Sequence, residues 1–148
     1  MARQNSIKIE YDDIQFDSLT EHNYYVYLKQ QKDKLGIQEI IPHPKYEIIP
    51  AYIVQCINHC DFGKVPSPKT GKPVNCKHCK GEGFKQKAPS YYTADFKILY
   101  IDGRTEIIDV KGGFIQKDFP LRKKIFESRY GQHVFVVKWD RVKGWVKK

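Results

Sequence analysis

The stretch Tyr91–Gly113, YYTADFKILYIDGRTEIIDVKGG, decides the fold that we expect for this chain. It reads as two short strands joined by a turn at Asp102-Gly103, with Asp95 on the first strand. Asp109 and Lys111 lie on the second strand and point to one face, because side chains alternate along a strand. Asp95 can face that pair across the hairpin. The opposite, apolar face is expected to consist of Ala94, Phe96, Ile108 and Val110.

Two carboxylates and a lysine beside a sheet can hold a divalent cation against a phosphate. A magnesium-type ion prefers hard oxygen ligands, which Asp95, Asp109 and the Val110 carbonyl would supply. Such an ion polarises a phosphate and lowers the pKa of a bound water. Lys111 would position that water or neutralise charge developing on the phosphate. The alternative is an ordinary surface salt bridge between Asp109 and Lys111, which is the common explanation of an isolated Asp-x-Lys triplet.

Length and composition favour one folded domain with room for a small addition. The chain has 148 residues, of which 41% are hydrophobic and 14% aromatic, which argues against disorder. The net charge of +9 suits a polyanion such as nucleic acid, although a basic surface also serves solubility. No apolar run of about 18 residues and no apolar leader is present, so we expect a cytoplasmic protein outside the membrane.

The N-terminal part predicts an arm over residues 1–17 and then a helix. Ser18 opens this helix, which runs to about Leu35, and Gly36 ends it. Its apolar stripe consists of Tyr24, Tyr25, Leu28 and Leu35. Glu21 lies on the same stripe and also completes a Ser18-x-x-Glu21 capping box, in which a glutamate satisfies the helix start and performs no chemistry.

The remaining elements predict a mixed sheet with a helix on each face. Residues 37–49 read as a strand pair or one bent strand around Pro42-His43-Pro44. Asp118 can cap a helix over 119–130, with Pro120 in its first turn. This helix has an apolar face (Leu121, Ile125, Phe126 and Tyr130) and basic residues that we expect to bind DNA (Arg122, Lys123, Lys124 and Arg129). The run Val134–Lys138 predicts a buried strand, followed by a basic tail with two tryptophans.

Residues 55–90 form a separate segment that contains all four cysteines, Cys56, Cys60, Cys76 and Cys79. Two short cysteine pairs are typical of a structural zinc ion held by four thiolates. His59 and His78 are left unligated because four cysteines suffice; the alternative is four free thiols in a loop. The lysines of the segment suggest contact with a phosphate backbone, and a merely solvated loop is the competing interpretation.

Five short motifs, taken in order, resemble a known family. They are SLTE with YY at 18–25, PKYEI at 44–48, YTADF at 92–96, DVKG at 109–112 and FESRYG at 126–131. In this order they look like the PD-(D/E)xK nuclease superfamily, and more narrowly its phage-encoded, Holliday-junction-resolvase-like (DUF1064-like) group. The likeness covers nearly everything except the arm and the cysteine segment.

The resemblance implies a restriction-endonuclease-like αβββαβ core over residues 18–54 and 91–148, with 55–90 as a zinc-binding insertion. By this likeness Glu21 becomes an active-site carboxylate beside Asp95, Asp109 and Lys111, and a capping role can coexist. Asp109 stands where many members have glutamate, and Ala94 precedes Asp95 where the name pattern has proline. Neither change removes a ligand.

The expected function is therefore a Mg²⁺- or Mn²⁺-dependent DNA endonuclease that acts on branched or recombining DNA. Junction resolution requires two coordinated cuts, so a homodimer is expected, in the host cytoplasm if the protein is phage-encoded. The alternative is a zinc-containing nucleic-acid-binding module with a catalytically silent nuclease fold. A purely structural protein is disfavoured by the charge and by the Asp95/Asp109/Lys111 set.

Overall fold

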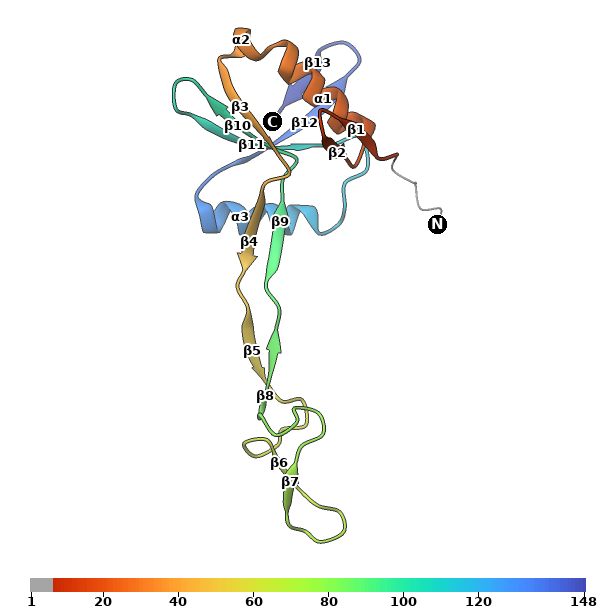
Figure 1. Cartoon of the computed structure of the whole chain (residues 1–148), viewed down its shortest axis with the longest axis vertical. Coiled ribbons are helices and arrows are strands. Elements are labelled where there is room, and N and C mark those ends of the chain that lie inside the picture. The colour runs from red at the N-terminus through yellow and green to blue at the C-terminus, as the bar shows by residue number, and fades with distance from the viewer. Residues whose placement is uncertain (1–6) are drawn as a thin grey trace. The chain divides into compact units, whose positions relative to one another are not determined.

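The computed structural model describes residues 7–148, which form two compact units (Figure 1). The core unit contains the chain up to Tyr46 together with Tyr92–Lys148, and the cysteine unit is Glu47–Tyr91. Residues 1–6 of the expected arm lie outside the described residues. None of the helices in the described part of the chain has both the length and the apolar composition needed to cross a bilayer.

A five-stranded mixed sheet forms the centre of the core unit. Its strand order is β13-β12-β11-β10-β3. Strands β11 (Thr105–Val110) and β12 (Val134–Asp140) are parallel, whereas the pairs with β3 (Ile37–Pro42), β10 (Phe96–Tyr100) and β13 (Gly144–Lys147) are antiparallel. Along the chain, the first long helix, β3, β10, β11, the second long helix and β12 give the order helix, strand, strand, strand, helix, strand. The hairpin before the first helix, the short helix after it, the pair of strands at the boundary with the cysteine unit and β13 are additional to this order. The expected mixed α/β architecture is therefore present.

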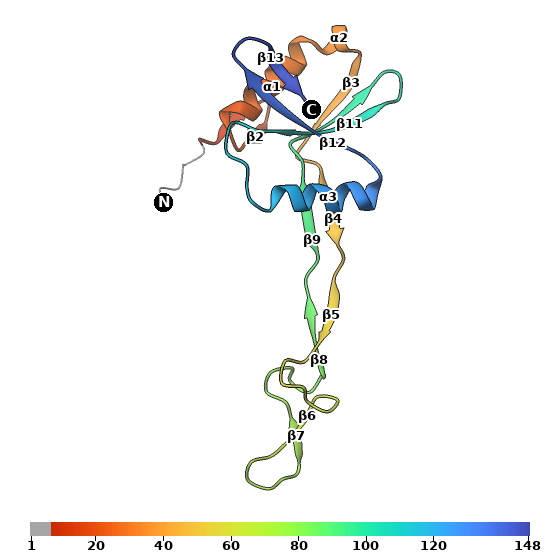
Figure 2. The same ribbon diagram turned by 180° about the vertical axis from the view of Figure 1, so that it is seen from behind.

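Helices cover both faces of this sheet, as the two opposite views show (Figures 1 and 2). Helix α1 (Leu19–Gln30) packs Tyr24, Tyr25 and Leu28 against Ile108 and Val110 of β11. Because strand side chains alternate, Ile107 and Asp109 point to the other face. There Tyr92 bonds to Asp109 and contacts Phe126 of α3 (Phe119–Tyr130), with ring centroids 5.4 Å apart.

Both long helices differ in detail from the sequence prediction. The first helix ends at Gln30, and a short helix α2 (Lys32–Leu35) continues to Gly36, a left-handed C-cap. Leu35 is exposed, so the apolar stripe ends with α1. In α3 the expected apolar residue Leu121 is also exposed. Asp118 occupies the N-cap position, but its carboxylate pairs with Arg122 and caps no backbone N–H.

The segment 37–49 forms two strands with different partners. Strand β3 pairs with β10, and β4 (Lys45–Ile49) pairs with β9 (Ser90–Thr93). His43 lies between them with φ +48°, a conformation that redirects the chain. The chain passes from the core unit to the cysteine unit within β4 and returns within β9.

Both ends of the core unit contain strands that the sequence did not predict. The expected arm contains a hairpin of β1 (Ile9–Tyr11) and β2 (Ile14–Phe16), and Phe16 at its end is fully buried in the main core. The expected tail contains β13, which pairs with β12 from Val137 to Asp140. In both places an aromatic side chain, Phe16 or Trp145, packs into or against the main core and holds a segment that the sequence prediction left without a fixed structure.

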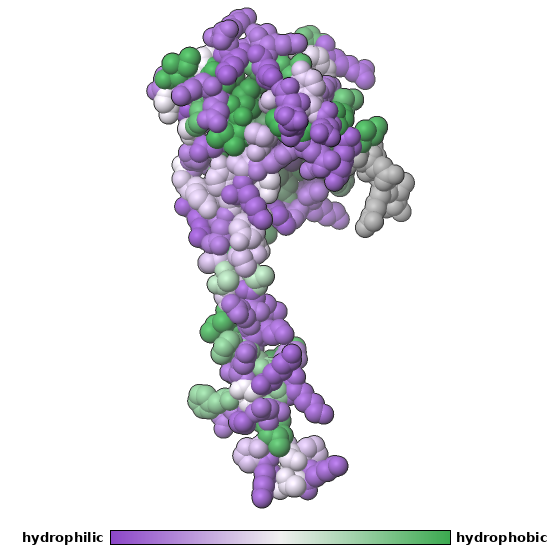
Figure 3. Space-filling model, in the orientation of Figure 1, coloured by the Kyte–Doolittle hydropathy of each residue, from purple (hydrophilic) through white to green (hydrophobic). Residues whose placement is uncertain are grey.

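The cysteine unit is built from two small antiparallel pairs and the thiol cluster. Strand β5 (Tyr52–Gln55) pairs with β8 (Phe84–Lys87), and β6 (Lys64–Pro66) pairs with β7 (Pro73–Asn75). Its buried centre consists of Cys56, Cys76 and Cys79, with Cys60 and Val65 packed against them. On the face visible in Figure 3, hydrophilic side chains cover most of this unit, with small hydrophobic patches between them.

Candidate functional site

A cavity of about 180 Å³ lies on the side of β11 that faces α3. The residues lining it are Tyr92, Thr93, Asp95, Asp109, Lys111, Gln116, Phe119 and Arg122. Asp95, Asp109 and Lys111 therefore share one cavity. Ala94, Phe96, Ile108 and Val110, expected on the opposite face, are all buried.

Asp95 does not lie on a strand, contrary to the sequence prediction, but at the break between β9 and β10. Its backbone N–H donates to the Ile108 carbonyl at 3.1 Å, and the Val110 N–H donates to Asp95 Oδ2 at 2.5 Å. Burial, together with the charges of Asp109 and Glu21, raises the pKa of Asp95 to about 8. The carboxyl is thus held where its ionised form is disfavoured.

Asp109 is 3% exposed and has two partners within the cavity. The Tyr92 hydroxyl donates to its Oδ2 at 2.7 Å, and the Lys111 ammonium forms an ion pair with its Oδ1. That ammonium also lies 4.0 Å from the centre of the Phe119 ring, a cation–π contact that holds it at the cavity wall. Burial and the Asp109 charge raise the pKa of Tyr92, which keeps the phenol protonated as a donor.

Glu21 lies on α1 and does not line this cavity. The Ser18 hydroxyl donates to Glu21 Oε1 at 3.1 Å and accepts from the Glu21 N–H at 3.2 Å, so the Ser18 half of the predicted capping box is present. Glu21 Oε2 lies 3.7 Å from Nε2 of His43. Burial is the main cause that raises the pKa of Glu21. The carboxylate acts on Asp95 through its charge.

Of the four basic residues predicted on α3, Arg122 reaches the cavity. Its guanidinium forms an ion pair with Asp118 at 2.8 Å. Lys123 lies 3.7 Å from Glu127, and Lys124 and Arg129 are exposed. The Val110 N–H donates to Asp95. The role of the Val110 carbonyl as a metal ligand stays a prediction.

The four cysteines converge, with their sulfur atoms all within 4.8 Å of one another. The Sγ atoms of Cys56 and Cys76 are 3.8 Å apart, and those of Cys60 and Cys79 are 3.6 Å apart. Four sulfurs bound tetrahedrally at the usual Zn–S length of about 2.3 Å would be about 3.8 Å apart. A hydrogen bond from the Cys79 backbone leads the contacts that lower the pKa of Cys76 to about 6, which favours the thiolate at this residue, whereas burial raises the pKa of Cys60. The cluster can hold a metal such as zinc.

Within residues 7–148 these cysteines are the one group of three or more Cys, His, Asp or Glu residues whose ligand atoms lie that close together. Glu21, Asp95 and Asp109 do not form such a group. The charges of Asp109 and Glu21 are close enough to contribute to the raised pKa of Asp95. However, the Lys111 ammonium forms an ion pair with Oδ1 of Asp109.

Sequence reasoning missed Tyr92 and His43. A continuous strand through Tyr92 and Ala94 would place both side chains on the apolar face. The break at Ala94-Asp95 ends that alternation and allows the phenol to reach Asp109. For His43, its position between two prolines was visible, but its backbone bond to the Asp95 carbonyl at 2.9 Å and its approach to Glu21 are tertiary.

Comparison with curated proteins found no match, and comparison with solved structures found none either. One family model matches residues 1–144, which is nearly the whole chain and spans the core unit and the cysteine unit together. The chain belongs to the family described as "Protein of unknown function (DUF1064)".

Proposed function

We propose that this protein is a metal-dependent DNA endonuclease that hydrolyses phosphodiester bonds in branched or recombination DNA. The observation that carries the proposal is the cavity in which Asp95, Asp109 and Lys111 meet, with the pKa of Asp95 raised to about 8. Strongly shifted carboxyls in a cleft are enriched at catalytic sites. A surface salt bridge between Asp109 and Lys111 would not need a carboxylate that is 3% exposed.

The order of elements supports the same proposal. Helix α1, strands β3, β10 and β11, helix α3 and strand β12 follow the αβββαβ order of the PD-(D/E)xK nucleases. Asp95 precedes β10, Asp109 lies near the end of β11, and Lys111, predicted on that strand, directly follows it. These are the places where that superfamily carries its Asp and its Asp/Glu-x-Lys pair. The likeness rests on motif order and topology.

The donor set of the cavity suits a hard divalent cation. Asp95 and Asp109 would hold magnesium through carboxylate oxygens, with the Val110 carbonyl as the further predicted ligand. Burial and then the neighbouring Asp109 and Glu21 carboxylates raise the pKa of Asp95, and a bound cation would offset that repulsion. When bound, magnesium would polarise the scissile phosphate and lower the pKa of the attacking water.

The chain's own residues would prepare the cavity for this reaction. Tyr92 fixes one oxygen of Asp109, and the Val110 N–H fixes one oxygen of Asp95. Lys111 and Arg122 bring positive charge to the cavity wall, where they would attract the phosphate and offset the charge that develops on it. Glu21 would tune Asp95 through its charge, and direct ligation of the ion by Glu21 remains the expectation from the family likeness.

A polyanionic partner agrees with the charge of the protein. The net charge is +9, and α3 carries Arg122, Lys123, Lys124 and Arg129, which would contact the phosphate backbone. Two coordinated cuts would require a homodimer if the substrate is a four-way junction.

A nucleic-acid-binding module with a silent nuclease fold is the second candidate. It is favoured by the distance between the carboxylates, since among residues 7–148 the ligand atoms of the cysteines alone meet the spacing of a metal group. This candidate predicts salt-sensitive DNA binding that needs neither magnesium nor the aspartates. The intact set of Asp95, Asp109 and Lys111 around one cavity argues against it.

Incubation of the purified protein with a four-way DNA junction and magnesium tests the proposal. We expect cleavage by the wild type, none detectable for Asp109→Asn or Lys111→Met, and wild-type cleavage for the matched control Asp33→Asn, an exposed residue of α2. If the protein binds DNA but cleaves none of the junction, flap and duplex substrates, the nuclease proposal is wrong and the nucleic-acid-binding module is favoured.

A further inference from the structure

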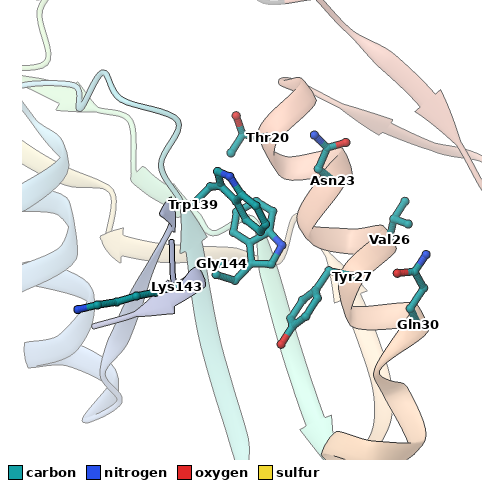
Figure 4. Close-up of a pocket in the computed structure, with 9 residues that line it drawn as sticks. Thr20, Asn23, Val26, Tyr27, Gln30, Trp139, Lys143 and Gly144 are labelled. Carbon is teal, nitrogen blue, oxygen red and sulfur yellow. The ribbon is translucent and has the colours of Figure 1, made fainter. Parts of the chain in front are cut away.

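A second and larger cavity, of about 630 Å³, lies between α1 and the β12–β13 hairpin (Figure 4). Its lining residues are Thr20, Asn23, Val26, Tyr27, Gln30, Trp139, Lys143, Gly144 and Trp145. In Figure 4, Trp139 lies on the hairpin side of this space, and Thr20 and Tyr27 face it from α1. None of the functional residues named above lines it.

Aromatic rings dominate the wall of this cavity. Trp139 and Trp145 are the two tryptophans of the whole chain. Their ring centroids are 5.1 Å apart in an edge-to-face arrangement, and Tyr27 lies 6.4 Å from Trp145. Trp139 is 58% exposed, so a large part of an indole stands free to stack. A ring held at one edge by a second ring is a ready platform for a flat ligand.

Polar groups at the cavity indicate which kind of flat ligand fits. The amide side chains of Asn23 and Gln30 line it, and such amides match the donors and acceptors on base edges. Lys143 also lines it and forms no ion pair with any carboxylate of residues 7–148. Residues 138–148 contain five cationic side chains and one carboxylate, which gives a local charge of +4. An aromatic floor with amide and ammonium groups suits a nucleobase that carries a phosphate.

The first turn of α1 connects the aromatic cavity to the segment that follows Lys111 of the candidate catalytic cavity. Thr20 lines the aromatic cavity and packs against Gly112 so closely that a Cβ there would lie 2.9 Å from Thr20 Oγ1. Gly112 directly follows Lys111, and Glu21 directly follows Thr20. Thr20 of the aromatic cavity is thus in direct contact with the residue that follows Lys111.

We propose that the cavity formed by Trp139, Trp145 and Tyr27 binds an unpaired nucleobase, with the adjoining phosphate on Lys143. The role of that base in the choice of DNA substrate rests on the proposed nuclease function. It would make a strand with an unstacked base the preferred substrate, and such bases occur at DNA branch points. The base-binding property itself does not depend on cleavage.

Intrinsic fluorescence tests this directly, because both tryptophans of the chain line the cavity. In magnesium-free buffer that retains the zinc, the protein is titrated with a single-stranded oligodeoxynucleotide, with the same strand made abasic, and with dAMP. We expect strong quenching by the oligonucleotide and little by the abasic strand. Quenching by dAMP at similar concentrations would identify a free nucleotide as a ligand, and quenching by the strand alone would identify a base within DNA.

Variants give a second readout through the anisotropy of a labelled oligonucleotide. Trp139→Ala should weaken binding about 10-fold, Trp139→Phe should retain most of the affinity, and Val142→Ala, 93% exposed and outside the cavity, should have no effect. Equal quenching by abasic and intact strands, or unchanged affinity of Trp139→Ala, would overturn the proposal. If the base binds but no DNA is cleaved, the proposed nuclease function is wrong and the proposed base site is supported. If DNA is cleaved but quenching does not depend on the base, the nuclease function is supported and the base site is wrong.

Discussion

The hydroxyl of Tyr92 donates a 2.7 Å hydrogen bond to Oδ2 of Asp109, and both residues are buried. The bond joins β9 to β11, and both residues line the candidate catalytic cavity. It leaves Oδ1 of Asp109 for Lys111. A carboxylate fixed on one oxygen can present the other in a constant direction, which is what a metal ligand needs.

Tyr92→Phe should lower both stability and activity. The variant removes the donor to a buried carboxylate oxygen, which costs about 1–3 kcal/mol in the free energy of unfolding, as measured by urea denaturation. If Asp109 holds the ion, a higher magnesium concentration should be needed for half-maximal cleavage. Tyr11→Phe, at a half-exposed tyrosine of β1, is the control and should change neither quantity.

Asp95 should make the stability of the magnesium-free protein depend on pH. Its pKa is about 8 in the folded protein against 3.8 for the ordinary carboxyl. Between these values the folded state binds more protons than the unfolded state, so stability falls as pH rises from about 4 to about 8. Thermal unfolding in magnesium-free buffer measures this trend. Asp95→Asn should flatten it, and an equal slope in wild type and variant would show that Asp95 is not the group concerned.

The hairpin around Asp102-Gly103 illustrates what was predictable from sequence. Ile108 and Val110 alternate with Asp109, and this period alone gives the buried face and the side on which Asp109 lies. The position of Asp95 was less predictable, because Ala94-Asp95 carries no turn signal and the break between β9 and β10 follows from pairing with β3 and β4. The strand β13 was missed because its four residues lie in a basic tail, and the contact of Trp145 with Tyr24 on α1 that holds it is tertiary.

Loss of one thiol should remove zinc and unfold the cysteine unit alone. We expect Cys76→Ser to contain no stoichiometric zinc by atomic absorption and to be cleaved by proteases within Glu47–Tyr91, because this unit has little buried surface besides its cysteines. His78→Ala should keep its zinc. The core unit has a separate hydrophobic core and should keep its thermal transition; zinc retained in Cys76→Ser would contradict the assignment.

Two glycines of the cysteine unit separate backbone strain from close packing. Gly63 and Gly71 both have positive φ, of +84° and +69°. A Cβ on Gly63 would lie 2.0 Å from the Gly81 carbonyl oxygen, whereas nothing lies within 4 Å of one on Gly71. Gly71→Ala should cost about 1–2 kcal/mol from the left-handed conformation alone.

Gly63→Ala must in addition displace backbone, so it should weaken zinc retention against a competing chelator much more than Gly71→Ala does. Equal zinc retention by the two variants would show that the contact between Gly63 and Gly81 does not hold the unit together.

The candidate site was predictable in its residue types and less so in its geometry. Asp109 and Lys111 could be paired from their spacing, because two residues apart on a strand means one face. The four cysteines could be grouped from spacing as well. Glu21 could not be resolved, since helix periodicity puts it on the buried stripe without giving the distance to Asp95. The approach of His43 to Glu21 depends on its own left-handed conformation, which the sequence does not reveal.

Diffraction from crystals soaked in Mn²⁺ tests the central claim most directly, because the anomalous signal of manganese locates the ion without reference to activity. The cysteine cluster provides an internal control through the zinc edge. We predict a manganese peak in the cavity of Asp95 and Asp109, with the Lys111 ammonium moved away from Asp109 Oδ1. A strong zinc peak at the cysteines with no manganese in that cavity, even with DNA bound, would contradict the account.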